Sequence, residues 1–165
     1  MNKYKGTILF LLLSSLLIVI DQITKLMVVR TFELHTGTYF INDFFGFFYT
    51  RNTGSAFSFL ADKSWGIYVL SAFSLVLSVV VLFFLIKATK ANEKLVACAL
   101  TLLLSGAVGN LIDRFRLHYV IDFIRFDFGS RTFPIFNVAD ICAVLGTIML
   151  IIIMIFLPDK ADKVW

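Results

Sequence analysis

Two aspartates in the C-terminal half of the sequence are the residues best placed by type and spacing to do chemistry. Asp122 lies in the motif VIDF (residues 120–123), and Asp140 closes the motif FNVAD (residues 136–140), where a long apolar run begins. Carboxylates at a membrane boundary are costly unless the protein uses them. If the two face each other they hold one proton between them, as in aspartic proteases. One then accepts a proton from water while the protonated one polarises a carbonyl, which predicts hydrolysis of a peptide bond.

Asp140 also has a simpler interpretation. Asn137 is a suitable helix N-cap, and Asp140 follows it at the third helical position. An acid in the first turn of a helix interacts favourably with the positive end of the macrodipole and can be a cap alone. The same environment favours the ionised form that a base requires, so both interpretations stay open.

The sequence offers few residues for other hydrolytic mechanisms. His35 and His118 are the only histidines and no HExxH motif is present, so a zinc site is not expected. Neither histidine has a serine or cysteine partner in a recognisable nucleophile motif. A serine–lysine pair stays open, with Lys25 as the only lysine inside a predicted span. We expect no metal and no cofactor.

The elements that must position these residues are membrane helices. The chain has 165 residues, of which 59% are hydrophobic and 16% charged, with a mean hydropathy of +0.91, values typical of membrane proteins. Four stretches hold the roughly 20 apolar residues that a span needs: 6–27, 65–86, 95–112 and 138–157. The first lacks a signal-peptide cleavage site, so we interpret it as an uncleaved anchor. We predict one integral membrane domain over residues 1–165.

Two longer segments, 28–64 and 113–137, connect the spans on one side. Residues 38–41 and 44–50 are aromatic and β-favouring with a turn signal at Asn42-Asp43, which predicts a small sheet on the membrane surface. Residues 119–128 are strand-like and offer extended backbone to a substrate peptide. The predicted fold class is therefore a membrane all-α protein with a small β element: four transmembrane helices, an outward-facing β-rich segment and a second outer loop.

Basic residues set the expected orientation. An even number of spans puts both termini on one side. Seven Lys and Arg lie in the terminal-side loops (1–5, 87–94 and 158–165) and seven in the two long segments. Because the terminal-side loops are much shorter, their basic residues are denser, which predicts that they face the cytoplasm. The long segments and the aspartates beside them then face outward.

Further polar residues gather near the outer ends of the spans. Asp21 and Lys25 share a face at i, i+4, either as a structural ion pair with Lys25 snorkelling to the interface or as support for a site at the same depth. Asn110, Asp113 and Arg114 fall on one face of the third span, and Arg114 is suited to hold a carbonyl or carboxylate.

Two other polar stretches favour structural roles. Asn52 and Gly54 lie in RNTGSAF (residues 51–57), which by itself favours an ordinary turn. The serines of the second span, Ser71, Ser74 and Ser78, are expected to bond back to their own helix.

At these residues the sequence resembles the bacterial lipoprotein signal peptidases, the type II signal peptidases. The resemblance covers essentially the whole chain and is carried by five motifs in order. They are Asp21 with Thr24-Lys25, Asn52-x-Gly54 followed by Ala56, Gly109-Asn110-x-x-Asp113-Arg114, VIDF and FNxAD. The departure is Ser55, where the family more often has alanine, and we expect it to alter packing rather than abolish activity.

The resemblance implies an activity and a set of site residues. Asp122 and Asp140 would be the catalytic dyad of an aspartic endopeptidase that cleaves a prolipoprotein just before its diacylglyceryl-modified cysteine. The implied partners are these lipid-modified substrates and membrane lipid, with no nucleic acid, for a monomer in the bacterial cytoplasmic membrane. A proton-coupled transporter and a non-catalytic scaffold remain as alternatives. The residues implied to line or support the site are Asn52, Gly54, Asn110, Asp113, Arg114, Asn137 and Ala139, with Asp21 and Lys25 more peripheral.

Overall fold

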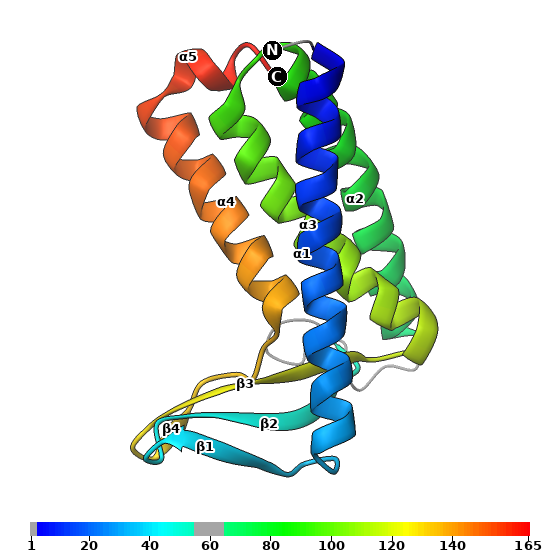
Figure 1. Cartoon of the computed structure of the whole chain (residues 1–165), viewed down its shortest axis with the longest axis vertical. Coiled ribbons are helices and arrows are strands. Elements are labelled where there is room, and N and C mark those ends of the chain that lie inside the picture. Colours follow the sequence, from blue (N-terminus) through cyan, green and yellow to red (C-terminus); the bar gives the residue numbers. More distant parts are fainter. Residues whose placement is uncertain (1–2, 55–64) are drawn as a thin grey trace.

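The structure, a computed structural model, describes residues 3–54 and 65–165 (Figure 1). Four of its helices are long and apolar enough to cross a bilayer: α1 (Lys3–Thr31), α2 (Gly66–Lys90), α3 (Lys94–Leu117) and α4 (Val138–Phe156). Both termini lie at one end of the helices, and a small sheet lies at the other (Figure 1). The predicted fold class is confirmed. Ser55 and Ala56, together with the rest of residues 55–64, lie outside the described residues.

Three helices continue beyond the C-terminal ends of the predicted spans. α1 ends at Thr31 rather than near residue 27, α2 at Lys90 rather than 86, and α3 at Leu117 rather than 112. Backbone hydrogen bonding does not stop where the apolar run stops: the Phe32 N–H still donates to the Val28 carbonyl at 2.9 Å. At the end of α3, His118 adopts a left-handed conformation and its N–H bonds to the Arg114 carbonyl. The extra turn of α1 packs Val28 against Tyr49 and Phe123 of the sheet. The extra turn of α3 brings the Asp113 carboxylate to the Ile121 N–H.

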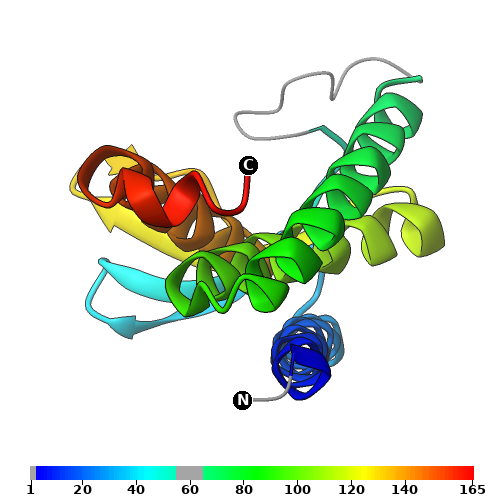
Figure 2. The same ribbon diagram turned by 90° about the horizontal axis from the view of Figure 1, so that it is seen from above.

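α3 is the most buried of the four spans and packs against the other three helices. Seen along the bundle, α1 lies on one side, and α2 and α4 lie apart from each other (Figure 2). The α3–α4 contact is close because a small residue faces α4: a Cβ on Gly106 would clash with the Ala139 carbonyl oxygen. The polar end of α3 is thereby held against the start of α4.

At the terminal end of the molecule, the short helix α5 (Pro158–Ala161) turns the chain back over the bundle. Val164 is fully buried there, and Lys163 Nζ lies 2.9 Å from Glu93 Oε1 in the connection between α2 and α3. This ion pair and the buried valine fasten the C-terminal segment to the helices.

The sheet joins both outer segments. Its antiparallel order is β1-β2-β3-β4, with β1 (Gly37–Ile41), β2 (Phe45–Asn52), β3 (Val120–Phe128) and β4 (Arg131–Thr132). The predicted strands of the first segment and the turn at residues 42–43 are present. The second segment is a strand pair of the same sheet, and its register pairs Thr50 with Asp122.

Candidate active site

Asp122 lies on β3 and is 2% exposed. Its carboxylate accepts two asparagine amides, Asn52 Nδ2 at 3.0 Å and Asn137 Nδ2 at 2.7 Å. Asn52 ends β2, so the pairing of β2 with β3 brings it beside Asp122. The Gly54 N–H donates to Asn52 Oδ1 at 3.0 Å, which orients the amide so that Nδ2 points to the carboxylate. Asn52 thus both forms the predicted turn and contacts Asp122.

Asp140 lies in the first turn of α4 and is part of a capping box. Its N–H donates to Asn137 Oδ1 at 2.9 Å, and its Oδ2 accepts the Asn137 N–H at 3.1 Å. The other carboxylate oxygen accepts Asn110 Nδ2 at 2.7 Å. The capping prediction is confirmed, but a cap alone does not require Asn110. We refer to Asp122 and Asp140 as the aspartate pair.

One side chain touches both members of the aspartate pair. Asn137 is fully buried, and its Nδ2 donates to Asp122 while its Oδ1 accepts the backbone N–H of Asp140. Asn137 Nδ2 also lies 3.0 Å from Asn110 Oδ1. Every side-chain bond that these contacts give the pair comes from a neutral amide. Within residues 3–54 and 65–165, no lysine or arginine forms an ion pair with either carboxylate.

The environment of Asp122 perturbs its acidity. Burial raises the pKa of Asp122 to about 7, and the nearby charge of Asp140 acts in the same direction, against the bonds from Asn52 and Asn137. Near neutral pH, Asp122 therefore holds a proton in a substantial part of the population. A carboxyl that is half protonated at working pH can act as a general acid.

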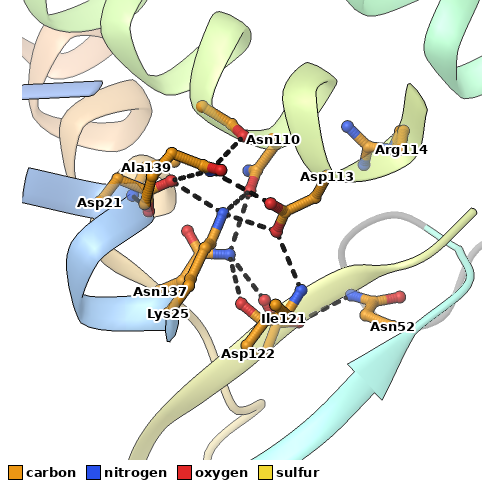
Figure 3. Close-up of polar contacts among 12 residues, drawn as sticks. Asp21, Lys25, Asn52, Asn110, Asp113, Arg114, Ile121, Asp122, Asn137 and Ala139 are labelled. Carbon is orange, nitrogen blue, oxygen red and sulfur yellow. Dashed lines mark hydrogen bonds and ion pairs between the residues drawn. The ribbon is translucent and has the colours of Figure 1, made fainter. Parts of the chain in front are cut away.

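A second group of charges lies on the other side of Asn110, and we call Asp21, Lys25 and Asp113 the lysine cluster. Lys25 is 1% exposed, and its Nζ lies 2.9 Å from Asp21 Oδ2 and 3.0 Å from Asp113 Oδ2 (Figure 3). Nζ also donates to Asn110 Oδ1 at 3.1 Å. Lys25 does not snorkel to the interface, because it forms ion pairs with two buried carboxylates inside the bundle. The contacts favour the alternative role, support of the site.

The carboxylates of the lysine cluster also bind the backbone. Asp21 Oδ1 accepts the Ala139 N–H at 2.9 Å, and Asp113 Oδ2 accepts the Ile121 N–H at 3.1 Å (Figure 3). Each of these N–H groups belongs to the residue immediately before one member of the aspartate pair. The lysine cluster therefore fixes the start of α4 and of β3 relative to α1 and α3.

Gln22 is a polar residue of the site that the sequence does not single out. Its Nε2 lies 3.1 Å from Asp21 Oδ2, 3.1 Å from Asp113 Oδ1 and 3.2 Å from the Gly109 carbonyl oxygen. It adds a neutral donor between the two carboxylates of the lysine cluster. Its one sequence signal is its position next to Asp21, and that does not set the direction of its side chain.

Arg114 does not join Asn110 and Asp113, with which it was predicted to share a face of the third span. Asn110 and Asp113 join the network around Lys25, whereas Arg114 lies apart from the dashed contacts in Figure 3. Arg114 Nη1 donates instead to Ser74 Oγ of α2 at 3.2 Å. Ser71 and Ser78 bond back to their own helix as expected, at 2.7 Å each. Ser74 differs by receiving a bond from another helix.

The aspartate pair opens into a cavity of about 930 Å³. Polar groups line it where β2, β3 and the end of α3 meet, and apolar side chains of α4 and residues 133–136 line the rest. In the part of the chain that the structure describes, no three His, Cys, Asp or Glu side chains are grouped to hold a metal ion. The lining includes Asn52, Arg114, Asp122, Asp140, Ile141, Val144 and Leu145.

Spanning helices and two aspartates, both in contact with Asn137 and facing a largely apolar cavity, define a membrane aspartic hydrolase. Residues 13–156 match the family model described as Signal peptidase (SPase) II. The chain belongs to the signal peptidase II family.

Relatives and a solved structure agree over most of the chain. The lipoprotein signal peptidase of Clostridium tetani is 38% identical over 147 residues, covering 88% of this chain and 92% of the relative. That of Enterococcus faecalis is 40% identical over 156 residues, covering 94% and 92%. A bacterial membrane enzyme of known structure superposes with a TM-score of 0.78 at 30% identity, covering 93% of this chain and 90% of that one. The fold and the family are therefore supported independently.

Proposed function

We propose that this chain removes the signal peptide from diacylglyceryl-modified prolipoproteins by cleaving before the lipidated cysteine, with Asp122 and Asp140 as its catalytic residues. The observation that carries the proposal is the buried amide of Asn137, which contacts both aspartates beside a large cavity. The names of its relatives, lipoprotein signal peptidases, support the substrate class.

The raised pKa of Asp122 supports a division of roles within the pair. Asp140 accepts a proton from water as the water oxygen attacks the scissile carbonyl, and Asp122 donates its proton to the carbonyl oxygen. The tetrahedral intermediate then collapses: the proton on Asp140 passes to the leaving nitrogen, and the hydroxyl proton returns to Asp122. Neither a covalent intermediate nor a cofactor is needed.

The cavity walls suit a substrate that is part lipid and part peptide. Ile141, Val144 and Leu145 of α4 offer an apolar surface to acyl chains lying in the bilayer. On the polar side Arg114 can donate to a carbonyl or ester oxygen, and Asn52 supports Asp122. The scissile bond is thereby placed between the apolar wall and the aspartate pair.

We infer an outward-facing site in the bacterial cytoplasmic membrane. The sheet exposes aromatic side chains at Phe40, Phe44 and Phe128, which suit the interface between membrane and water. The opposite end carries the lysine-rich short loops, so both termini are assigned to the cytoplasm. We assign residues 1–165 to one domain that works as a monomer.

A gel-shift cleavage assay tests the function. The purified chain is mixed with a diacylglyceryl-modified prolipoprotein and, separately, with the same protein lacking the lipid. We expect cleavage of the lipidated form alone, and loss of cleavage in Asp122→Asn and in Asp140→Asn. Asp127→Asn is a matched control on β3, since Asp127 bonds to Tyr39, Arg125 and Thr132 away from the cavity. A folded Asp122→Asn or Asp140→Asn that cleaves at the wild-type rate would contradict the two-aspartate mechanism, and equal cleavage of both substrates would contradict the substrate class.

A further inference from the structure

Arg114 has hydrogen-bonding capacity that the described residues do not use. It is 9% exposed, and a guanidinium carries five N–H donors. Within residues 3–54 and 65–165, Nη1 bonds to Ser74 Oγ, and the buried Nε has no hydrogen-bond partner. Because a buried charged donor without an acceptor is costly, the arrangement indicates a site prepared for a group that arrives with the substrate.

Arg114 lies close enough to the aspartate pair to be attracted to it, so another contact must hold its side chain away. The side chain lines the same cavity as Asp122 and Asp140, whose charges attract a guanidinium. Yet no ion pair within the described ranges joins Arg114 to either aspartate. Such an ion pair would favour two ionised carboxylates and remove the shared proton that hydrolysis needs. Arg114 must therefore stay in the cavity but off the aspartate pair.

The only side-chain hydrogen bond that Arg114 makes to a described residue comes from α2. Ser74 Oγ accepts from Arg114 Nη1 at 3.2 Å, across 40 residues of sequence. Two serines at neighbouring turns of the same helix give a direct contrast. Ser71 Oγ donates to the Ile67 carbonyl and Ser78 Oγ to the Ser74 carbonyl, so both serve only their own helix in these contacts.

We propose that Ser74 is a positioning residue for substrate binding. Its hydroxyl holds the Arg114 guanidinium toward α2, which keeps it from the aspartate pair and leaves its other N–H groups for a carbonyl or ester oxygen of the lipidated substrate. The inference rests on the proposed function and adds α2 to the site, a helix with no charged residue before Lys87.

Steady-state cleavage of a diacylglyceryl-modified peptide tests the role of Ser74, with Ser78→Ala as the matched control. For Ser74→Ala we expect KM to rise about tenfold while kcat changes less than about twofold, the size of effect typical for a hydrogen bond to a charged group. Ser74→Thr retains a hydroxyl and should restore KM to within about twofold of wild type. Ser78→Ala should leave both constants unchanged, and equal melting temperatures in detergent establish that all variants are folded.

A double-mutant cycle separates positioning from a general packing effect. Since Ser74 acts through Arg114, Ser74→Ala should change KM less than about twofold in an Arg114→Ala background. A wild-type KM in Ser74→Ala, an equal rise in Ser78→Ala, or a full effect in the Arg114→Ala background each overturns the inference while leaving the proposed function intact. If wild type and Ser78→Ala both fail to cleave, the proposed function fails and the inference falls with it.

Discussion

Two pairs of carboxylates, all buried except the half-buried Asp140, lie at the same end of the helices and are held in different ways. In the lysine cluster, Asp21 and Asp113 share one ammonium, with Lys25 Nζ about equally close to both at 2.9 and 3.0 Å. In the aspartate pair, the Asp122 carboxylate accepts the Asn137 side-chain amide, and the Asp140 carboxylate accepts the Asn137 backbone N–H and the Asn110 amide. Two carboxylates with a cation between them can both stay ionised, whereas two that are held by neutral donors are relieved by a proton. The first arrangement builds structure, and the second keeps a proton available for chemistry.

Asn110 connects the two pairs. Its Oδ1 accepts from Lys25, and its Nδ2 donates to Asp140. Lys25 thus acts on the aspartate pair through a neutral side chain rather than by direct contact. This spacing lets the lysine cluster fix geometry at the site without neutralising the carboxylate that accepts the proton.

Replacing one carboxylate in each pair should give the largest and most clearly different effects on activity and stability. We expect Asp122→Asn to reduce cleavage roughly 10³-fold or more, the loss expected for a general acid, with no loss of stability because like charges are removed. Asp113→Asn should do the reverse, lowering the free energy of unfolding because one of two counter-ions of Lys25 is lost. Cleavage rates and SDS titration in mixed micelles measure the two effects. Comparable stability losses in both variants would show that the pairs do not differ in kind.

Removing the cation should have the next largest effect. Lys25→Met leaves Asp21 and Asp113 buried without their ammonium, which should cost about 3–5 kcal/mol in the free energy of unfolding. Adding Asp21→Asn and Asp113→Asn removes the unpaired charges and should recover much of that loss. Unfolding in mixed micelles follows both steps. If Lys25→Met is as stable as wild type, Asp21 and Asp113 are not both ionised, and the proposed difference between the two pairs is wrong.

Much of the fold follows directly from the sequence. Runs of apolar residues predict the four spans, and aromatic runs with Asn42-Asp43 between them predict β1 and β2. These features are local, because length, hydropathy and turn chemistry act over a few residues. The N-cap at Asn137 is predicted for the same reason, and its capping box with Asp140 is present.

Contacts between distant segments are what the sequence does not predict. Asn52 and Asp122 are 70 residues apart, and they meet because β2 pairs with β3 in one sheet. The rotation of each helix about its axis also has no local signal. A helical projection places Arg114 on the same face as Asn110. In the structure, Arg114 instead donates to Ser74 on α2.

The pH dependence should separate the two pairs further. With the pKa of Asp122 raised to about 7, its acid form is depleted above pH 7, and kcat should fall about tenfold per pH unit there. The raised pKa also means that the folded state binds this proton more tightly than the unfolded chain. Stability present at low pH is therefore lost as pH rises from about 4 to about 7, by at most about 4 kcal/mol. In Asp122→Asn that loss should disappear, and an unchanged pH profile of stability would contradict the assignment.

The smallest of these effects should come from Asn110, which holds the two pairs together. Asn110→Ala removes one donor from Asp140 and one acceptor from Lys25, yet Asp140 keeps its bond from the Asn137 N–H and Lys25 keeps both carboxylates. We therefore expect kcat to fall roughly tenfold and the free energy of unfolding to fall by about 1–2 kcal/mol. Asn42→Ala, in the exposed β1–β2 turn, should change neither. If Asn110→Ala instead loses as much activity as Asp122→Asn at equal stability, Asn110 takes part in the chemistry, and the separation between a structural and a catalytic pair has to be redrawn to include it.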